Sequence, residues 1–277
     1  LATELAVVAL ELAERLREVT VDIERARGDL DRLDRAVAEL RASAPGGDAT
    51  GDGAPVVDDA YYWSFEQRMR GDASSVVARL RQYERFAVAL REELPTHGES
   101  SESAQPLWLD LGCGLGEFCE LVQEWGWRVH GVDNSPGAVD ACRAKGIDAT
   151  LAAVDGYLET RRGEAPGAIS AIQLIEHIPR GEWIPLFERI YETLRPGGKM
   201  LIETINGLNP EAVASYFVAD VTHTWPGHPE TLRLMAEHAG FRSVEVVFLN
   251  EDHRGSAQDF AIWAHKAVDG ADSDQHG

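Results

Sequence analysis

The stretch Leu107-Trp-Leu-Asp-Leu-Gly-Cys-Gly-Leu-Gly-Glu117 decides the fold. A short apolar run carries Asp110 near its end, and three glycines follow at alternate positions before a helical pattern begins near residue 116. Glycines let a backbone turn sharply and approach a ligand where a side chain would clash. Ligands of open α/β sheets bind beyond the carboxyl ends of the strands, near such a turn. The stretch therefore predicts a strand, a ligand-binding turn and a helix.

From residue 106 onward, short apolar runs alternate with helical patterns. The predicted strands cover residues 107–111, 128–132, 148–152, 168–174 and 199–204, and the predicted helices lie near 116–126, 135–145, 155–162 and 181–195. Strands that alternate with helices of this length indicate a parallel sheet covered on both faces. A helix at 229–239 precedes strands at 243–249 and 258–265, which adjoin without a long crossover and predict an antiparallel pair at the sheet edge.

A second acidic residue ends the next predicted strand. Asp133 follows strand 128–132, where a carboxylate can accept hydrogen bonds from ribose hydroxyls. Together with the glycine turn, it predicts a cofactor that contains adenosine. The glycines are spaced GxGxG with Glu117 next, whereas dinucleotide enzymes use GxGxxG to hold a pyrophosphate at the start of a helix. This spacing argues against a nicotinamide-dependent oxidoreductase.

Two further motifs follow in order. They are Gln173-Leu-Ile-Glu-His177 at the end of the fourth predicted strand and Leu194-Arg-Pro-Gly-Gly-Lys199 before the fifth. In this combination the chain resembles class I S-adenosylmethionine-dependent methyltransferases over about residues 61–266. The resemblance implies an α/β fold with a seven-stranded Rossmann-like sheet, mostly parallel with an antiparallel edge, and S-adenosyl-L-methionine as the cofactor. We expect the cofactor to be bound by Asp110, Gly112, Gly114, Gly116, Asp133, Asn134, Asp155, Gln173 and Arg68.

Other segments resemble a subgroup of these enzymes that is associated with bacterial glycan and glycosylated-metabolite synthesis. The segments are Phe65-Glu-Gln-Arg-Met-Arg-Gly71, Glu203-Thr-Ile-Asn206, Asp220-Val-Thr-His223 and His228-Pro-Glu-Thr-Leu232. This resemblance implies O-methylation of a sugar-like acceptor. A methyltransferase for a phosphate, a carboxylate or a nitrogen is an alternative, and so is a non-catalytic cofactor-binding partner that acts through a coiled coil.

The chain departs from the family pattern at two places. Ala153 stands where the family has an acidic residue that contacts the adenine amino group. Asp155, two residues on, is a candidate substitute, and binding of adenine by backbone groups alone is the alternative. Val221 and Trp225 replace residues that are commonly proline and arginine, which indicates a different acceptor. Arg68 is a candidate partner for the carboxylate of methionine or of an acidic acceptor.

A sugar hydroxyl must lose a proton to become a nucleophile, and a histidine that titrates near neutrality suits that task. We expect His223 to be the general base, because Asp220 lies close to it in the sequence. His177, after the fourth strand, is the second candidate, and His228 in the same acceptor loop is the third. Asp-x-x-His is weak evidence for a metal, so we predict none.

The amino-terminal part of the chain carries a heptad pattern. Apolar residues recur every seven positions from Leu5 to Leu40, with a second series between them, which predicts a long coiled-coil helix. We expect it to join two copies of the chain as a homodimer, with packing onto its own catalytic domain as the alternative. The predicted segments are a coiled-coil helix (1–44), a flexible acidic linker (45–60), a helical pre-core segment (61–105), a methyltransferase domain (106–268) and a disordered tail (269–277).

Composition narrows the possible partners. The net charge of -21 repels phosphate backbones and anionic lipids, so we expect neither nucleic acid nor a membrane as a partner, but a small molecule or a glycan. The three cysteines form no CxxC pair, which favours a reducing compartment. No apolar run approaches the roughly 20 residues that span a bilayer, and we see no signal peptide. The cytoplasm is the expected location.

Overall fold

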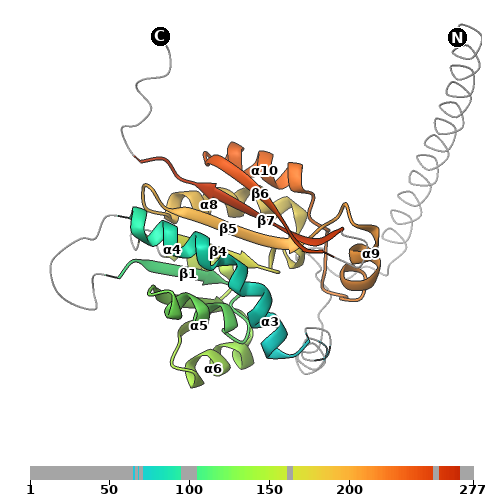
Figure 1. Cartoon of the computed structure of the whole chain (residues 1–277), viewed down its shortest axis with the longest axis horizontal. Helices are drawn as coiled ribbons and strands as arrows, with labels where there is room; N and C mark the ends of the chain where they lie inside the picture. Colours follow the sequence, from blue (N-terminus) through green and yellow to red (C-terminus); the bar gives the residue numbers. More distant parts are fainter. Residues whose placement is uncertain are drawn as a thin grey trace, which may run out of the picture. The chain divides into compact units, whose positions relative to one another are not determined.

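A computed structural model describes Phe65, Arg68 and residues 71–94, 105–160, 165–251 and 256–268. Its centre is a seven-stranded sheet in the order β3-β2-β1-β4-β5-β7-β6 (Figure 1). The strands are β1 (Leu107–Leu111), β2 (Arg128–Asp133), β3 (Asp148–Leu151), β4 (Ala168–Ile172), β5 (Lys199–Ile205), β6 (Arg242–Glu251) and β7 (Ala257–His265). The predicted coiled coil, acidic linker and tail lie outside the described residues.

The strand directions confirm the predicted sheet. β1 to β5 pair in parallel, while β7 pairs antiparallel with both β5 and β6. The predicted antiparallel pair at the edge is therefore present, with β7 inserted between β5 and β6. Because parallel strands share their carboxyl edge, the segments that follow β1, β4 and β5 meet there, and the antiparallel β7 brings its first residues to the same edge.

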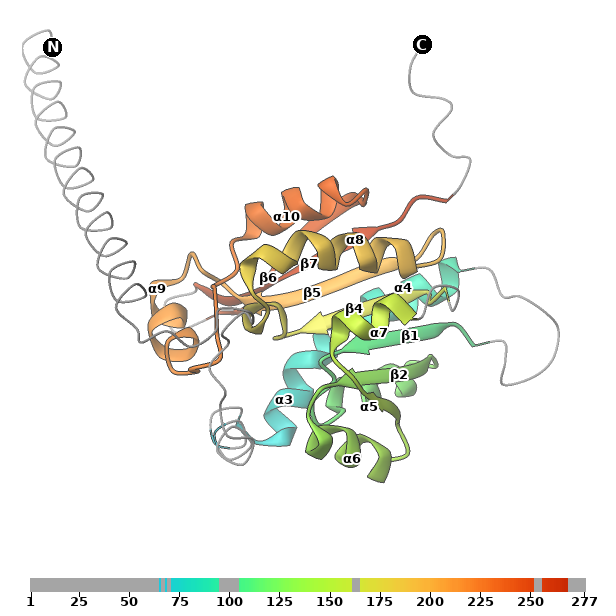
Figure 2. The ribbon, with the colours of Figure 1, turned by 180° about the vertical axis from the view of Figure 1, so that it is seen from behind.

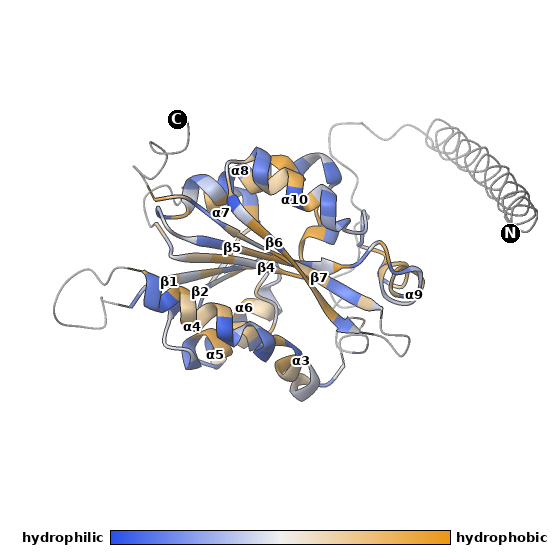
Figure 3. Ribbon diagram, turned by 45° about the horizontal axis from the view of Figure 1, so that its top comes forward, coloured by the Kyte–Doolittle hydropathy of each residue, from blue (hydrophilic) through white to orange (hydrophobic). Residues whose placement is uncertain are grey.

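Helices cover both faces of the sheet (Figures 2 and 3). One face carries α3 (Ala73–Leu80), α4 (Glu84–Glu93), α5 (Glu117–Glu124) and α6 (Pro136–Ala144), and the other carries α7 (Val154–Thr160), α8 (Trp183–Thr193) and α10 (Pro229–His238). The sheet residues alternate between two cores, since successive strand side chains point to opposite faces. Thus Trp108 packs among the first group of helices and Leu109 among the second.

Short irregular turns connect the regular elements near the carboxyl edge. They are η1 (Arg81–Tyr83), η3 (Ile175–His177), η4 (Arg180–Glu182), α9 (Pro210–Ala212) and the π-helix η5 (Val213–Phe217). Single-turn π-helices occur often at functional sites. Among the helices that the structure describes, none is long and apolar enough to cross a membrane.

The predicted pre-core segment contributes α3, η1 and α4. Its buried residues Val76, Leu80 and Leu90 join the core beside β1. Tyr83 is only 1% exposed, and its hydroxyl donates a hydrogen bond to Glu203 of β5. This contact joins the pre-core segment to the floor of the cavity described below.

Candidate functional site

The turn after β1 has the backbone that the glycine spacing predicts. Gly112, Gly114 and Gly116 have φ angles of 69°, 51° and 82°, in the left-handed region that side chains disfavour. A Cβ on Gly112 would lie 2.8 Å from Cδ1 of Leu174, and one on Gly116 would lie 2.7 Å from Cδ1 of Ile147. Glycine at these two positions therefore lets the turn pack tightly against its neighbours.

Asp133 lies at the end of β2, beside the glycine turn. One carboxylate oxygen accepts a hydrogen bond from the backbone N–H of Gly114 (2.9 Å), and the other accepts one from Ser135 N–H (2.8 Å). A carboxylate oxygen can accept more than one hydrogen bond, so both can still bind ribose hydroxyls. The next residue, Asn134, is exposed and lies outside the cavity lining.

Asp110 is buried beneath the turn. Its carboxyl group accepts hydrogen bonds from the Ser170 hydroxyl and from the Cys119 thiol at 3.4 Å. Burial raises the pKa of Asp110 to about 7, since little solvent reaches the charge. The predicted cofactor residue thus holds the turn against β4 and α5.

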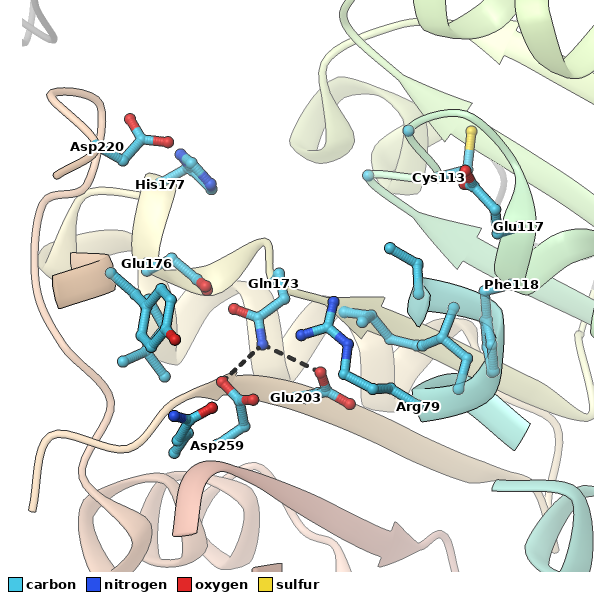
Figure 4. A pocket seen from close by; sticks show the side chains of 18 of the residues that line it. Arg79, Cys113, Glu117, Phe118, Gln173, Glu176, His177, Glu203, Asp220 and Asp259 are labelled. Carbon is cyan, nitrogen blue, oxygen red and sulfur yellow. Dashed lines mark hydrogen bonds between the residues drawn. The ribbon is translucent and has the colours of Figure 1, made fainter. Parts of the chain in front are cut away.

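A cavity of roughly 530 Å³ opens at the carboxyl edge, a volume typical of small-molecule sites (Figure 4). Of the residues predicted for the site, those that line it are Asp110, Gly112, Gly114, Gln173, His177 and His223. Those outside its lining are Gly116, Asp133, Asn134, Asp155, Arg68 and His228. Asp133 and Gly116 nevertheless belong to the turn that forms one wall.

Two of the predicted cofactor residues outside the lining are Asp155 and Arg68. Asp155, on α7, accepts a hydrogen bond from Arg189 of α8 at 2.8 Å, which directs its carboxylate to the neighbouring helix. Arg68 is exposed. Among the described residues that line the cavity, Arg79 of α3 carries the one guanidinium, and no sequence motif indicates it.

Gln173 follows β4 and occupies the middle of the cavity floor (Figure 4). Its φ of 50° is unusual for a residue with a side chain, and such backbone strain concentrates at functional sites. Its amide group donates hydrogen bonds to Glu203 (3.0 Å) and to Asp259 (3.1 Å). Burial and then the charge of Asp259 raise the pKa of Glu203 to about 7.

Sequence motifs indicate only part of this floor. Glu203 belongs to a recognised motif, but Asp259 and Tyr83 come from segments with no chemical signature of their own. Their proximity depends on the pairing of β5 with β7 and on the docking of η1. The sequence signal that could have indicated Asp259 is a carboxylate within the otherwise largely apolar strand Ala257–His265.

Glu176 is fully buried beside the floor. Its Oε2 accepts a hydrogen bond from Thr204 (2.9 Å), while its Oε1 has no hydrogen-bond partner among the described residues. Burial raises the pKa of Glu176 to about 8, and the charges of Asp259 and Glu203 add to the effect. Neutral pH therefore leaves this side chain largely protonated.

His177 and His223, two of the predicted general bases, lie close together in the cavity lining. The ring centres of His177 and His223 are 4.6 Å apart. Nδ1 of His177 lies 2.8 Å from the Thr222 hydroxyl, and Nδ1 of His223 lies 2.9 Å from the carbonyl oxygen of Phe217. Burial, followed by the neighbouring His223, lowers the pKa of His177 to about 4. His177 is therefore neutral at physiological pH.

Asp220 completes this cluster. Its Oδ2 lies 3.8 Å from Nε2 of His223, too far for a hydrogen bond. One ligand atom from each of His177, Asp220 and His223 lies within 4.8 Å of the others, so the three could also hold a metal ion. His228, the third predicted candidate, is exposed just before α10 and lies outside the cavity lining.

A family model described as "Methyltransferase domain" matches residues 77–246, more than half of the chain. The chain belongs to this methyltransferase family. The match confirms the predicted enzyme class.

Several relatives are named ubiquinone biosynthesis O-methyltransferase rather than glycan enzymes. The one from Sinorhizobium medicae is 28% identical over 145 residues, which cover 49% of this chain and 58% of that protein. One from a Chelativorans species is 31% identical over 128 residues, covering 42% and 49%. The chain thus spans about half the length of the curated relatives it matches.

Among solved structures, an S-adenosylmethionine-dependent methyltransferase from Archaeoglobus fulgidus is similar with a TM-score of 0.64. It is 26% identical, and the match covers 74% of this chain and 100% of that one. The similarity supports the seven-stranded methyltransferase fold across most of the described residues.

Proposed function

We propose that this methyltransferase transfers a methyl group to a hydroxyl oxygen of a small, sugar-like acceptor. S-adenosylmethionine is its methyl donor, and it supplies the methyl group on a sulfonium that needs no electrophilic assistance. The glycine turn and Asp133 hold the adenosine end. β4 lies next to β1 in the sheet, so Gln173, which follows β4, lines the same cavity as the glycine turn. We place the methionine end of the cofactor toward Gln173. The enzyme's main task is then to position and deprotonate the acceptor.

The observation that carries this proposal is the pair of partly buried imidazoles in the cavity lining. A hydroxyl is a poor nucleophile until it loses its proton, and a neutral imidazole can take that proton. The ring centres of His177 and His223 lie 4.6 Å apart. His177 and Asp220 lie at the end of the cavity opposite Cys113 of the glycine turn (Figure 4). A phosphate or carboxylate acceptor would arrive ionised and would need no such group.

The surroundings favour a sugar-like acceptor. Both amide hydrogens of Gln173 are donated to Glu203 and Asp259, and the oxygen atoms of the three side chains give the floor acceptors for hydroxyl groups. Tyr216, which lines the cavity, is 46% exposed, whereas Trp225 lies outside the lining with the guanidinium of Arg180 4.4 Å from its ring centre. Aromatic rings of this kind can stack on a sugar.

A second candidate acceptor is a phenolic hydroxyl. The relatives from Sinorhizobium medicae and Chelativorans are named for ubiquinone biosynthesis, and both are O-methyltransferases. They support oxygen as the methylated atom and favour an aromatic ring in place of the sugar. We place the enzyme in the cytoplasm for either acceptor.

The test is a screen of the purified full-length chain with S-adenosylmethionine against glycosides and catechol-type phenols. Mass spectrometry should detect the gain of one methyl group, and a His177→Gln/His223→Gln double variant should lose it. The His228→Gln variant is the matched control, since that histidine is exposed outside the cavity. Methylation of only phosphates, carboxylates or amines would overturn the proposal. Cofactor binding without any methylation would favour the non-catalytic partner.

A further inference from the structure

The loop that carries Asp220 and His223 is hydrogen-bonded to the turn that carries His177. Thr222 is the connecting residue, because its hydroxyl lies 2.8 Å from Nδ1 of His177 and 2.6 Å from Oδ1 of Asp220. The same Oδ1 also accepts the backbone N–H of Thr222 at 2.8 Å. Thr222 therefore stands between the carboxylate and the imidazole.

The directions of these hydrogen bonds follow from the number of hydrogens. A threonine hydroxyl has one hydrogen, and an ionised carboxylate can only accept. Thr222 must give its hydrogen to Asp220, so its oxygen accepts a hydrogen from Nδ1 of His177. A neutral imidazole with hydrogen on Nδ1 has none on Nε2, and the bond made by one nitrogen fixes the state of the other.

We propose that Thr222 is a positioning residue, which holds His177 in its Nδ1-protonated tautomer and so makes Nε2 the atom that accepts the proton of the acceptor hydroxyl. This inference rests on the proposed function. In the step, the acceptor O–H bond breaks, its electron pair stays on oxygen for the new bond to the methyl carbon, and the proton goes to Nε2. Asp220 then stabilises the charged imidazole through Thr222.

The same reasoning separates the two histidines. Nδ1 of His223 lies 2.9 Å from the carbonyl oxygen of Phe217, which can only accept, so His223 also carries its hydrogen on Nδ1. Its partner is a neutral carbonyl, whereas the partner of His177 is linked to a carboxylate. Oδ2 of Asp220 lies 3.8 Å from Nε2 of His223, too far for a hydrogen bond, whereas the hydrogen-bonded chain through Thr222 orients the ring of His177. We therefore place His177 first as the base, which reverses the order that the sequence predicts.

The loop has a second attachment that offers a matched control. The N–H and hydroxyl of Thr224 donate to the carbonyl oxygen of Glu176 (2.7 and 3.0 Å), and the hydroxyl also lies 2.7 Å from the carbonyl oxygen of Ile178. Thr224→Val removes the hydroxyl bonds of this attachment and leaves Thr222 intact. Thr222→Val has nearly the shape of threonine and removes the bridge alone.

The experiment is ¹⁵N NMR of the histidine rings in the full chain at neutral pH, with His177 assigned by its loss in His177→Gln. In the wild type, Nδ1 of His177 should be protonated and Nε2 unprotonated. Thr222→Val should move His177 toward the Nε2-protonated tautomer, while Thr222→Ser and Thr224→Val should keep the wild-type pattern. A measurement of tautomers needs no acceptor, so it stands apart from the test of the proposed function.

An Nε2-protonated His177 in the wild type would overturn the inference, even if Thr222→Val failed to fold. So would a Thr222→Val protein that keeps the wild-type tautomer. Once an acceptor is known, Thr222→Val should lower kcat at least about tenfold and leave KM unchanged. This loss is part of the roughly 10²–10⁴-fold that a general base contributes to the rate. Thr222→Ser should restore kcat, which a purely structural role of the methyl group would not allow.

Discussion

The carboxylate of Asp133 accepts a hydrogen bond from the backbone N–H of Gly114 at 2.9 Å, which ties the end of β2 to the glycine turn after β1. The two features that predict the cofactor from the sequence are therefore one physical unit. The bond fixes the turn, and the remaining capacity of the carboxylate lies where ribose hydroxyls are expected.

Asp133→Ala should weaken S-adenosylmethionine binding by about 1.5–3 kcal/mol, the scale for a lost hydrogen bond to a charged group. Calorimetry measures the loss directly. Asp140→Ala, at an exposed position on α6, is the control and should bind normally. Unchanged affinity in a folded Asp133→Ala protein would contradict the assignment, as would tighter binding of NAD than of S-adenosylhomocysteine.

Glu176 should make the protein less stable as the pH rises. Its pKa is raised from 4.5 to about 8 in the folded state, so the folded chain retains a proton that the unfolded chain loses. The resulting stabilisation is complete below about pH 4.5 and is lost as the pH rises through about 8. Glu176→Gln should remove this loss of stability. Its Tm at pH 8 should rise by roughly 2–4 °C for each kcal/mol by which the free energy of unfolding increases.

Thermal unfolding at pH 5 and pH 8 provides the measurement. The control is Glu245→Gln on β6, where the side chain is exposed. If the Tm of Glu176→Gln falls between pH 5 and pH 8 by as much as the Tm of the wild type, Glu176 ionises normally.

His177→Gln should lower kcat by about 10²–10⁴-fold and leave cofactor affinity nearly unchanged, because the base acts only on the acceptor. His177 has a pKa of about 4, so the wild-type rate should stay level from pH 8 to pH 5 and fall only as this group gains a proton.

If the variants of His177, His223 and His228 all keep a near-native kcat, no histidine is the base. A rate that a chelator abolishes and Mg²⁺ restores would make His177, Asp220 and His223 metal ligands instead.

Deleting residues 1–44 should give a monomer that still binds cofactor, since the predicted coiled coil is the expected dimer contact. Light scattering of the full chain and of the shortened chain decides the matter. A full chain that is monomeric at micromolar concentration would show that the helix packs on its own domain.

The sequence predicts the fold well, because strand and helix periodicity is a local property. The alternation of elements and the GxGxG turn locate the sheet and the turn at Gly112, and strand pairing confirms them. The site is harder to predict, because its contacts join distant segments. Tyr83 reaches Glu203 across 120 residues, and His177 meets Thr222 across 45.

The predictions for Asp155 and Arg68 illustrate the same limit. Spacing along the chain places Asp155 near the adenine, but Arg189 of a neighbouring helix attracts its carboxylate. No sequence pattern indicates that Arg189 lies there, because α7 and α8 meet only in the folded chain. Side-chain direction depends on such partners and not on the motif.

The identity of the atom that receives the methyl group decides whether this enzyme is an O-methyltransferase. The full chain would be incubated with S-adenosylmethionine labelled with ¹³C in its methyl group and with the acceptor found by the screen, and the product examined by ¹³C NMR. We predict one labelled methyl ether, formed by the wild type and strongly reduced in His177→Gln. A labelled methyl group on nitrogen, or in a carboxylate or phosphate ester, would contradict the account.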